Sequence, residues 1–175
     1  MSLPPHKNRA YSVYVGIDPG ESGGIAILSD AGACLAAVPM SKSIPGVWEF
    51  IRDIPANSTT KVMIESVHAY PGQGAVSTWK FGMHYGMLIG MLTAHFSNFR
   101  LESCKVSPQK WQGSYLGLPK RQSHLTAYQN KKRLKDALIS RARKYYPEFV
   151  PSTQKGVMAV SDALLIARYA WKEYA

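Results

Sequence analysis

Two strands joined by a glycine-rich turn limit the folds open to this chain more than any other feature of its sequence. In YVGIDPGESGGIAIL (14–28), Val15 and Ile17 alternate with other residues, and Ile25 and Ile27 repeat the pattern. Such alternation is typical of strands with one buried face, and PGESGG is typical of a turn. A third strand follows SDAGA, so we expect strands over 11–18, 23–29 and 33–40. Links this short predict an antiparallel meander.

The rest of the chain alternates helical and strand patterns. We expect a helix over 44–54, a strand over 60–67, a helix over 76–96, a strand over 100–107, and helices over 131–146 and 159–174. This order predicts an α/β fold, a mixed five-stranded sheet flanked by helices. Its 175 residues suit one domain with a sizeable core. We expect that domain over 11–175, preceded by a flexible tail over 1–10.

The bulk composition excludes disordered and membrane-spanning classes. Hydrophobic residues make up 46% of the chain and charged residues 18%, which is typical of a globular protein. No apolar run is long enough for a membrane span, and the start, MSLPPHKNRA, lacks the apolar core of a signal peptide. Cys34 and Cys104 show no zinc-type spacing, so a reducing setting without secretion is expected.

The charge of the chain points to a polyanionic partner. Its net charge is +10, and residues 105–155 carry twelve Lys and Arg against two acids, Asp136 and Glu148. A field of this kind attracts nucleic acid, although a solvated helix face is the alternative. The candidate phosphate contacts are Lys110, Lys120, Arg121, Lys131, Lys132, Arg133 and Lys155.

Three carboxylates follow or interrupt apolar segments. Asp18 ends the first strand, Glu65 ends the fourth, and Asp162 stands between VMAV and ALLIA. Each alone fits a turn, cap or ion-paired residue. If the first and fourth strands are parallel neighbours, their ends meet at one edge of the sheet, where ligands bind. Crowded carboxylates need divalent cations, and oxygen ligands suit Mg²⁺ or Mn²⁺, so phosphodiester chemistry is expected.

Four motifs add a family resemblance. GIDPGESGGIAI, MIESVHAYPGQGAVSTWKFGMHYGMLIGML, KVSPQKW and SDALLIARY, in this order, resemble the RuvC-type Holliday junction resolvases over residues 12 to about 172. They are most similar to the smaller phage-encoded and organellar-like branch. The resemblance implies an RNase H-like fold and a homodimer that cuts four-way DNA junctions. It also implies work in the cytoplasm of a bacterial or phage-infected cell, or in an organelle.

The resemblance assigns roles to the three carboxylates and exposes one departure. It puts Asp18, Glu65 and Asp162 on positions that hold two Mg²⁺, or Mn²⁺, for in-line hydrolysis. The family usually carries a further acid or a histidine one helical turn before the last aspartate, where this chain has Val157, Met158 and Ala159. Two interpretations follow: a working resolvase that makes symmetric nicks, or a fold that binds junctions without cutting.

Other features carry weaker expectations. The resemblance places the helix with Gly82, Gly86 and Gly90 at the dimer interface, and the alternative is close packing on the protein's own sheet. Tyr70 lies in a loop that could reach an unpaired base, or that merely connects a strand to a helix. Two tryptophans, Trp79 and Trp111, are expected in the core.

A third class of function shares the first motif. GIDPGESGG also resembles the phosphate loop of actin- and sugar-kinase-type ATPases. Those enzymes hold a nucleotide between two such domains, and this sequence has neither a second glycine-rich phosphate loop nor a GxxxxGK[ST] motif. No nucleotide cofactor is therefore expected.

Overall fold

The protein forms a five-stranded mixed sheet with helices on both faces, as expected. The structure, a computed structural model, describes residues 12–57, 59–68, 72, 74–115, 117–151 and 154–175, so the expected tail lies outside it. Its elements are β1 (Val13–Asp18), β2 (Gly24–Ser29), β3 (Cys34–Pro39), α1 (Ile44–Arg52), β4 (Lys61–Glu65), α2 (Ala75–His95), α3 (Leu101–Cys104), β5 (Lys105–Val106), α4 (Pro108–Gly113), α5 (Ala127–Tyr145) and α6 (Gln154–Tyr174).

The strand order β3-β2-β1-β4-β5 confirms both pairings on which the site prediction depends. The strands β1, β2 and β3 pair antiparallel, whereas β4 lies parallel to β1 and to β5. The carboxyl ends of β1 and β4 therefore meet at the same edge of the sheet.

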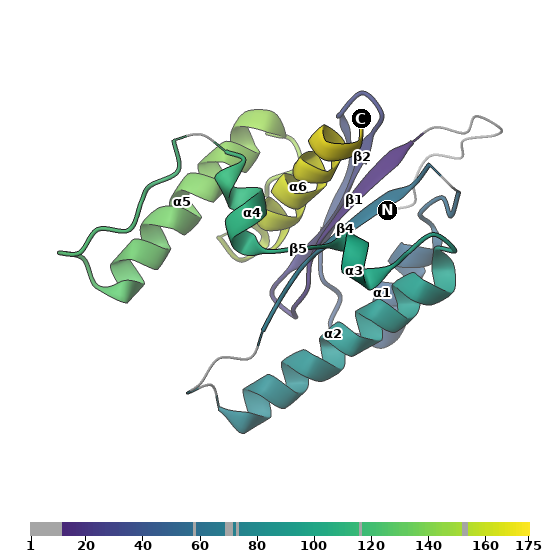
Figure 1. The fold of residues 1–175 in the computed structure, drawn as a ribbon, viewed down its shortest axis with the longest axis horizontal. Coiled ribbons are helices and arrows are strands. Elements are labelled where there is room, and N and C mark those ends of the chain that lie inside the picture. The colour runs from purple at the N-terminus through teal and green to yellow at the C-terminus, as the bar shows by residue number, and fades with distance from the viewer. Residues whose placement is uncertain (1–11, 58, 69–71, 73, 116, 152–153) are drawn as a thin grey trace.

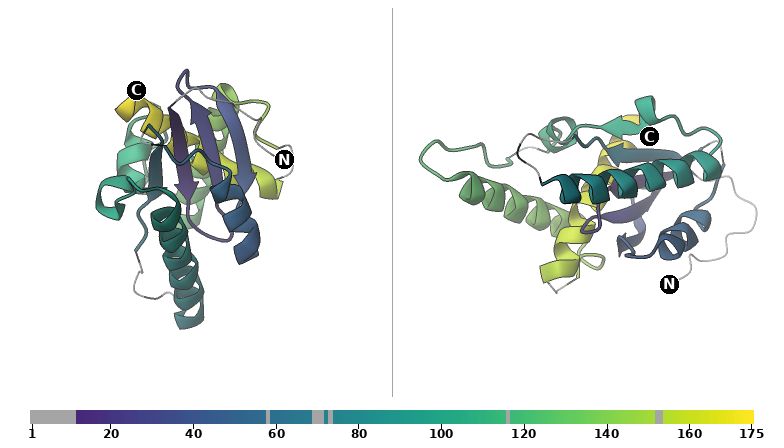
Figure 2. Two further views of the ribbon diagram at one scale, coloured as in Figure 1. Left: turned by 90° about the vertical axis from the view of Figure 1, so that its right-hand side faces the viewer. Right: turned by 90° about the horizontal axis from the view of Figure 1, so that it is seen from below.

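Helices lie on both faces of the sheet (Figure 1), and successive side chains of β1 enter two separate cores. Val13, Val15 and Ile17 pack with buried residues of α1 and α2 on one face. Tyr14 packs on the other face with residues of α4, α5 and α6. The result is a three-layer arrangement, with the sheet between two groups of helices (Figure 2).

Glycines let α6 lie directly on the centre of the sheet. A Cβ atom at Gly16 in β1 would overlap the backbone of Ala163 and Ala167. A Cβ at Gly24 in β2 would overlap the carbonyl oxygen of Ala159. The contact is thus backbone against backbone, and it fixes where Asp162 lies relative to β1.

The segment after α2 differs from the expected strand over 100–107. The backbone N–H groups of Ser103 and Cys104 donate to the carbonyl of Arg100, so residues 101–104 form a short helix. The following strand β5 has two residues and pairs only with Ile64 and Glu65.

Three helix starts also differ from the expectation. The helix α4 was not expected, and it begins after Ser107, whose hydroxyl caps Lys110 N–H. The helix α5 begins four residues earlier than expected, at a capping box formed by Thr126 and Gln129. The helix α6 begins at 154 instead of 159.

The two tryptophans have opposite environments. Trp111 is fully buried, as expected. The expectation for Trp79 is wrong, because its side chain is 68% exposed. It lies in the N-terminal half of α2, which extends past the sheet (Figure 1).

The thiols of Cys34 and Cys104 are both free. No helix within the described part of the chain combines the length and the apolar character that crossing a membrane requires.

Candidate active site

Asp18 and Glu65 lie side by side at the carboxyl edge of the sheet. Ile17 of β1 is in register with Ile64 of β4, and each carboxylate is the next residue of its strand. Both side chains line one cavity of about 530 Å³. The opposite wall of that cavity comes from α2, through Ser77, Lys80, Phe81 and His84.

Asp162 reaches the same edge from α6 and is held by a lysine. Its Oδ2 accepts a hydrogen bond of 2.5 Å from the Nζ of Lys135 in α5. Both side chains are largely buried, with 14% of Asp162 and 24% of Lys135 exposed. The other carboxylate oxygen, Oδ1, is buried and has no partner among the described residues.

The three carboxylates and the ammonium group act on one another electrostatically. The pKa of Asp18 is raised to about 7, mainly because the side chain is buried, and further by the negative charges of Asp162 and Glu65. Burial likewise raises the pKa of Glu65, and Asp162 adds to that effect. The positive charge of Lys135 opposes both shifts. The four groups therefore form one coupled cluster.

Trp111 fixes the orientation of Glu65. Its indole Nε1–H donates to Glu65 Oε2 at 2.8 Å, and this hydrogen bond opposes the rise in the pKa of that carboxyl. The indole is packed in the core, so the donor cannot move away. Sequence reasoning placed Trp111 in the core but missed this contact, which brings the short helix α4 into the site.

The carboxylate oxygens at this edge suit a hard divalent cation, but they do not form a complete set of metal ligands as they stand. Mg²⁺ and Mn²⁺ prefer carboxylate oxygens. Asp18 and Glu65 supply such oxygens from one cavity, and Asp162 Oδ1 is a buried oxygen without a partner. Yet no group of three or more Asp, Glu, His or Cys side chains in the described chain lies close enough to hold a metal ion as it stands.

Among the three residues one helical turn before Asp162, Met158 has the most exposed side chain. Met158, four residues earlier on α6, is 44% exposed and lines a groove with Lys135 and Asp162. Val157 and Ala159 are buried, at 3% and 5% exposed. Met158 is therefore the position from which an additional acid could reach the carboxylates.

Basic side chains surround this groove, which runs between α5 and α6. Lys131 and Lys132 line it and are exposed. The N-terminal halves of α5 and α2 both extend past the ends of β1 and β4 (Figures 1 and 2). The carboxylates thus lie at the carboxyl edge of the sheet, next to the positively charged helix α5.

The other expected phosphate contacts have mixed positions. Lys110 on α4 and Lys120 and Arg121 before α5 are exposed. Arg133 is only half exposed and donates to Gln122 Oε1 at 2.7 Å, which ties the preceding loop to α5. The structure does not describe Tyr70 or the side chain of Lys155.

One exposed face of α2 carries three glycines and exposed apolar side chains. A Cβ atom added at Gly82, Gly86 or Gly90 would meet no described atom within 4 Å apart from the nearby backbone of its own helix, so these glycines do not pack on the described sheet. Trp79 and Met83 are exposed on the same part of the helix. The alternative explanation of the glycines from the sequence is therefore wrong.

Two further residues at the site, Lys135 and His84, were not assigned to it from the sequence. Lys135 stands three residues before Leu138 and seven before Ala142, both buried, so helical periodicity could have shown it as a lysine on the buried stripe of α5. His84 lines the cavity of Asp18 and Glu65, and its ring nitrogens are buried without a partner among the described residues.

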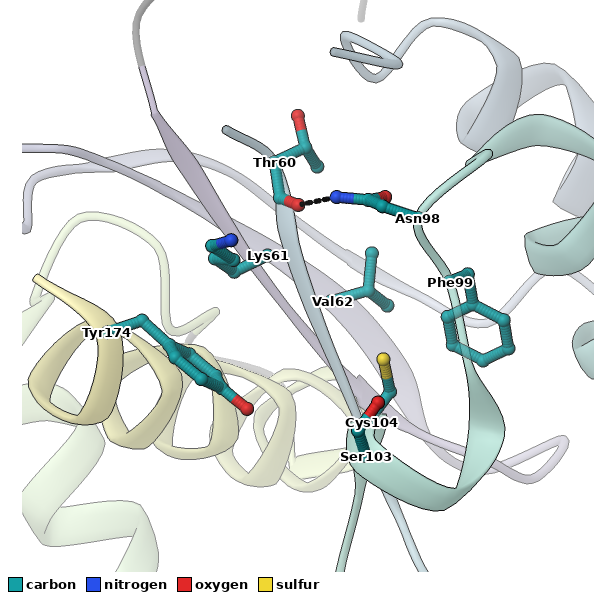
Figure 3. A pocket seen from close by; sticks show the side chains of 8 residues that line it. All are labelled: Thr60, Lys61, Val62, Asn98, Phe99, Ser103, Cys104 and Tyr174. Atoms are coloured by element: carbon teal, nitrogen blue, oxygen red, sulfur yellow. Dashed lines mark hydrogen bonds between the residues drawn. The ribbon is translucent and has the colours of Figure 1, made fainter. Parts of the chain in front are cut away.

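A separate cavity of about 230 Å³ lies at the opposite end of β4 (Figure 3). Lys61, Cys104 and Tyr174 line it, and Asn98 Nδ2 donates to the Thr60 carbonyl at 3.1 Å. None of the described residues that line it is acidic. The carboxylates belong to the other end of the strand, so this cavity is not part of the candidate active site.

No protein-family model matches this sequence, and no curated protein matches it. Among solved structures, the chain is similar to T. thermophilus RuvC in complex with Holliday junction substrate, with 15% sequence identity and a TM-score of 0.50. The match covers 90% of this chain and 92% of that chain. At this identity the likeness shows the fold, and it confirms the RNase H-like sheet of RuvC that the sequence predicts.

Proposed function

We propose that this protein is a metal-dependent endonuclease that recognises four-way DNA junctions. The observation that carries the proposal is the meeting of Asp18, Glu65 and Asp162 at one sheet edge, beside the basic helix α5. The fold supports it, because the similar RuvC structure holds a Holliday junction. The four motifs of the sequence support membership of the smaller phage-encoded and organellar-like branch.

The chemistry follows from the carboxylates. When bound, Mg²⁺ or Mn²⁺ supplies an activated water and neutralises charge on the phosphate. Asp18 and Glu65 would bind the cation from their shared cavity, and Trp111 holds Glu65 in one orientation by its 2.8 Å hydrogen bond. In the metal-free protein about half of the Asp18 carboxyl groups carry a proton near pH 7, since the pKa is about 7.

The DNA would lie over the basic residues that border the carboxylates. Lys131 and Lys132 line the groove next to Asp162, and Lys110, Lys120 and Arg121 extend the positive surface. We include Arg133, Lys155 and Tyr70 among the DNA contacts on the basis of the sequence alone. Phosphate contacts of this kind position DNA and carry no sequence code.

A homodimer would form through α2. Its glycine face is open, and Trp79 and Met83 expose apolar surface beside it. A two-fold axis would place two equivalent sites on opposite strands of a junction. Gly86→Arg should therefore give a monomer by light scattering, whereas Gly113→Arg, at an equally open glycine of α4, should leave the dimer intact.

A second candidate function is junction binding without cutting. Two observations favour it: Asp162 is paired with Lys135, and Met158 offers no oxygen where a fourth acid would stand. Met158→Asp separates the two functions, because its side chain would enter the groove next to Asp162. If this substitution turns on cutting in a protein that only binds, the chain is a junction-binding protein in its present form.

The proposal is tested with a labelled immobile four-way junction and a linear duplex of matched length. In Ca²⁺ we expect selective binding of the junction, and in Mg²⁺ paired nicks that Glu65→Gln abolishes. Gln keeps an oxygen that can accept from Trp111, so this variant removes the charge and retains the fold. Selective binding without nicks in either metal would favour the second function. Equal, weak binding of both DNAs would refute the junction assignment.

A further inference from the structure

We propose that Lys135 is a resident cation of the carboxylate site, and that its ammonium group takes the place of one of two metal ions. The site then binds a single divalent cation. This inference rests on the proposed function and names the ion content of the same site. Lys135 acts through Asp162 and is thus a positioning residue.

The geometry puts the ammonium group where a cation is needed. Lys135 Nζ lies 2.5 Å from Asp162 Oδ2, and both side chains are shielded from solvent. Lys135 belongs to the buried stripe of α5, with Leu138 one turn further along, so the lysine is held toward α6 by the packing of its helix. The neighbouring Lys131 and Lys132 are exposed instead.

The charges of the cluster balance with one divalent ion. Asp18, Glu65 and Asp162 carry three negative charges when ionised, and Lys135 contributes one positive charge. Two negative charges remain, which one divalent cation neutralises. Two divalent cations would leave an excess of two positive charges in a largely buried site, and uncompensated buried charge is costly.

The oxygen atoms available as ligands also favour a single divalent cation. Lys135 occupies Oδ2 of Asp162, which leaves Oδ1 as the oxygen without a partner in the described structure. A single ion bound by Asp18 and Glu65 could take up this oxygen only if the Asp162 side chain moved toward them, because the three carboxylates do not form a closed metal site as they stand. A second ion bound at Asp162 would need a further oxygen from the same face of α6, and Met158, one turn earlier on that helix, supplies none.

The test counts Mn²⁺ ions bound to the DNA-free full chain by calorimetric titration at pH 8. We expect one ion per chain in the wild type and in Lys135→Arg, which keeps the positive charge. We expect a second ion in Lys135→Met, which frees Oδ2 of Asp162. Lys144→Met is the matched control, since this exposed lysine lies about 13 Å further along α5, and it should bind one ion.

A second pair of variants keeps the test decisive if Lys135→Met fails to fold. Met158→Asp makes the cluster more negative by the same single charge from the exposed side of the groove, so it should also bind two ions. Met158→Asn adds a side chain of the same shape without charge and should bind one.

The result is distinguishable from failure of the proposed function, since no DNA is present. A wild-type number other than one would overturn the inference. So would equal numbers for Lys135→Met and Lys144→Met, or for Met158→Asp and Met158→Asn. The expected pattern together with absent junction selectivity would leave the inference standing and refute the junction assignment alone.

Discussion

Asp18→Asn should stabilise the metal-free protein at pH 8. The carboxyl group is buried beside two other carboxylates, and its pKa is raised from 3.8 to about 7. At 1.36 kcal/mol per pKa unit, this shift corresponds to a destabilisation of roughly 4 kcal/mol once the group is ionised. Water that enters the cavity lined by Asp18 would reduce the penalty, so we expect a gain of about 2–4 kcal/mol in the free energy of unfolding.

The sign of the effect depends on pH. Between about pH 4 and pH 7 the native protein binds more protons at Asp18 than the unfolded chain does. The free energy of unfolding of the wild type therefore falls as the pH rises through this window, and the loss is complete above about pH 7. Asn does not titrate, so the two proteins should be equally stable below about pH 4 and should diverge as the pH rises.

Urea unfolding in EDTA at pH 4 and pH 8 measures this difference. Asp53→Asn is the control, because Asp53 follows the last residue of α1, its side chain is 53% exposed, and its replacement should change stability by less than about 0.5 kcal/mol. Adding Mg²⁺ should stabilise the wild type and leave Asp18→Asn unchanged. If metal-free Asp18→Asn is less stable than the wild type at pH 8, the ionised Asp18 carboxylate does not destabilise the native protein, and the reasoning is refuted.

Three further changes test separate contacts. Trp111→Phe removes a hydrogen bond that stabilises the ionised carboxylate of Glu65, so the pKa of Glu65 should rise further above its usual value in a carbon-13 NMR titration; an unchanged pKa would contradict the contact. Gly16→Ala should cost about 3 kcal/mol in urea unfolding because its Cβ overlaps α6, whereas Gly82→Ala should be neutral or stabilising by up to about 1 kcal/mol; equal effects would disprove the close contact. Replacing Lys131 and Lys132 by Ala should weaken junction binding. The slope of the log of the binding constant against the log of the salt concentration should become less negative by about 1.8, and an unchanged slope would exclude phosphate contacts.

The sheet could be predicted from the sequence because its signals are local and strong. Alternating apolar residues in β1 and β2, and the short turns between them, leave few arrangements open. The parallel pairing of β1 and β4 then brings Asp18 and Glu65 together. The strand expected over 100–107 was wrong because its apolar pattern does not show that residues 101–104 turn into a helix.

The contacts of the site were harder to predict than its acids. The bond from Trp111 to Glu65 needs α4, whose only signal is Ser107 followed by proline. The pairing of Lys135 with Asp162 depends on how α5 packs on α6, which no local pattern specifies. Trp79 shows the same limit, because helical periodicity cannot tell whether a helix extends past the sheet it packs on.

The backbone contact between β1 and α6 determines when the three carboxylates come together during synthesis of the chain. Gly16 and Ala163 are far apart in the chain, yet their contact brings Asp162 to Asp18. A nascent chain on the ribosome therefore has Asp18 and Glu65 but no third carboxylate until α6 has emerged and docked. Contacts of such long range form late in folding. The carboxylate cluster is thus completed as one of the last steps of folding, and a chain still under synthesis lacks its third member.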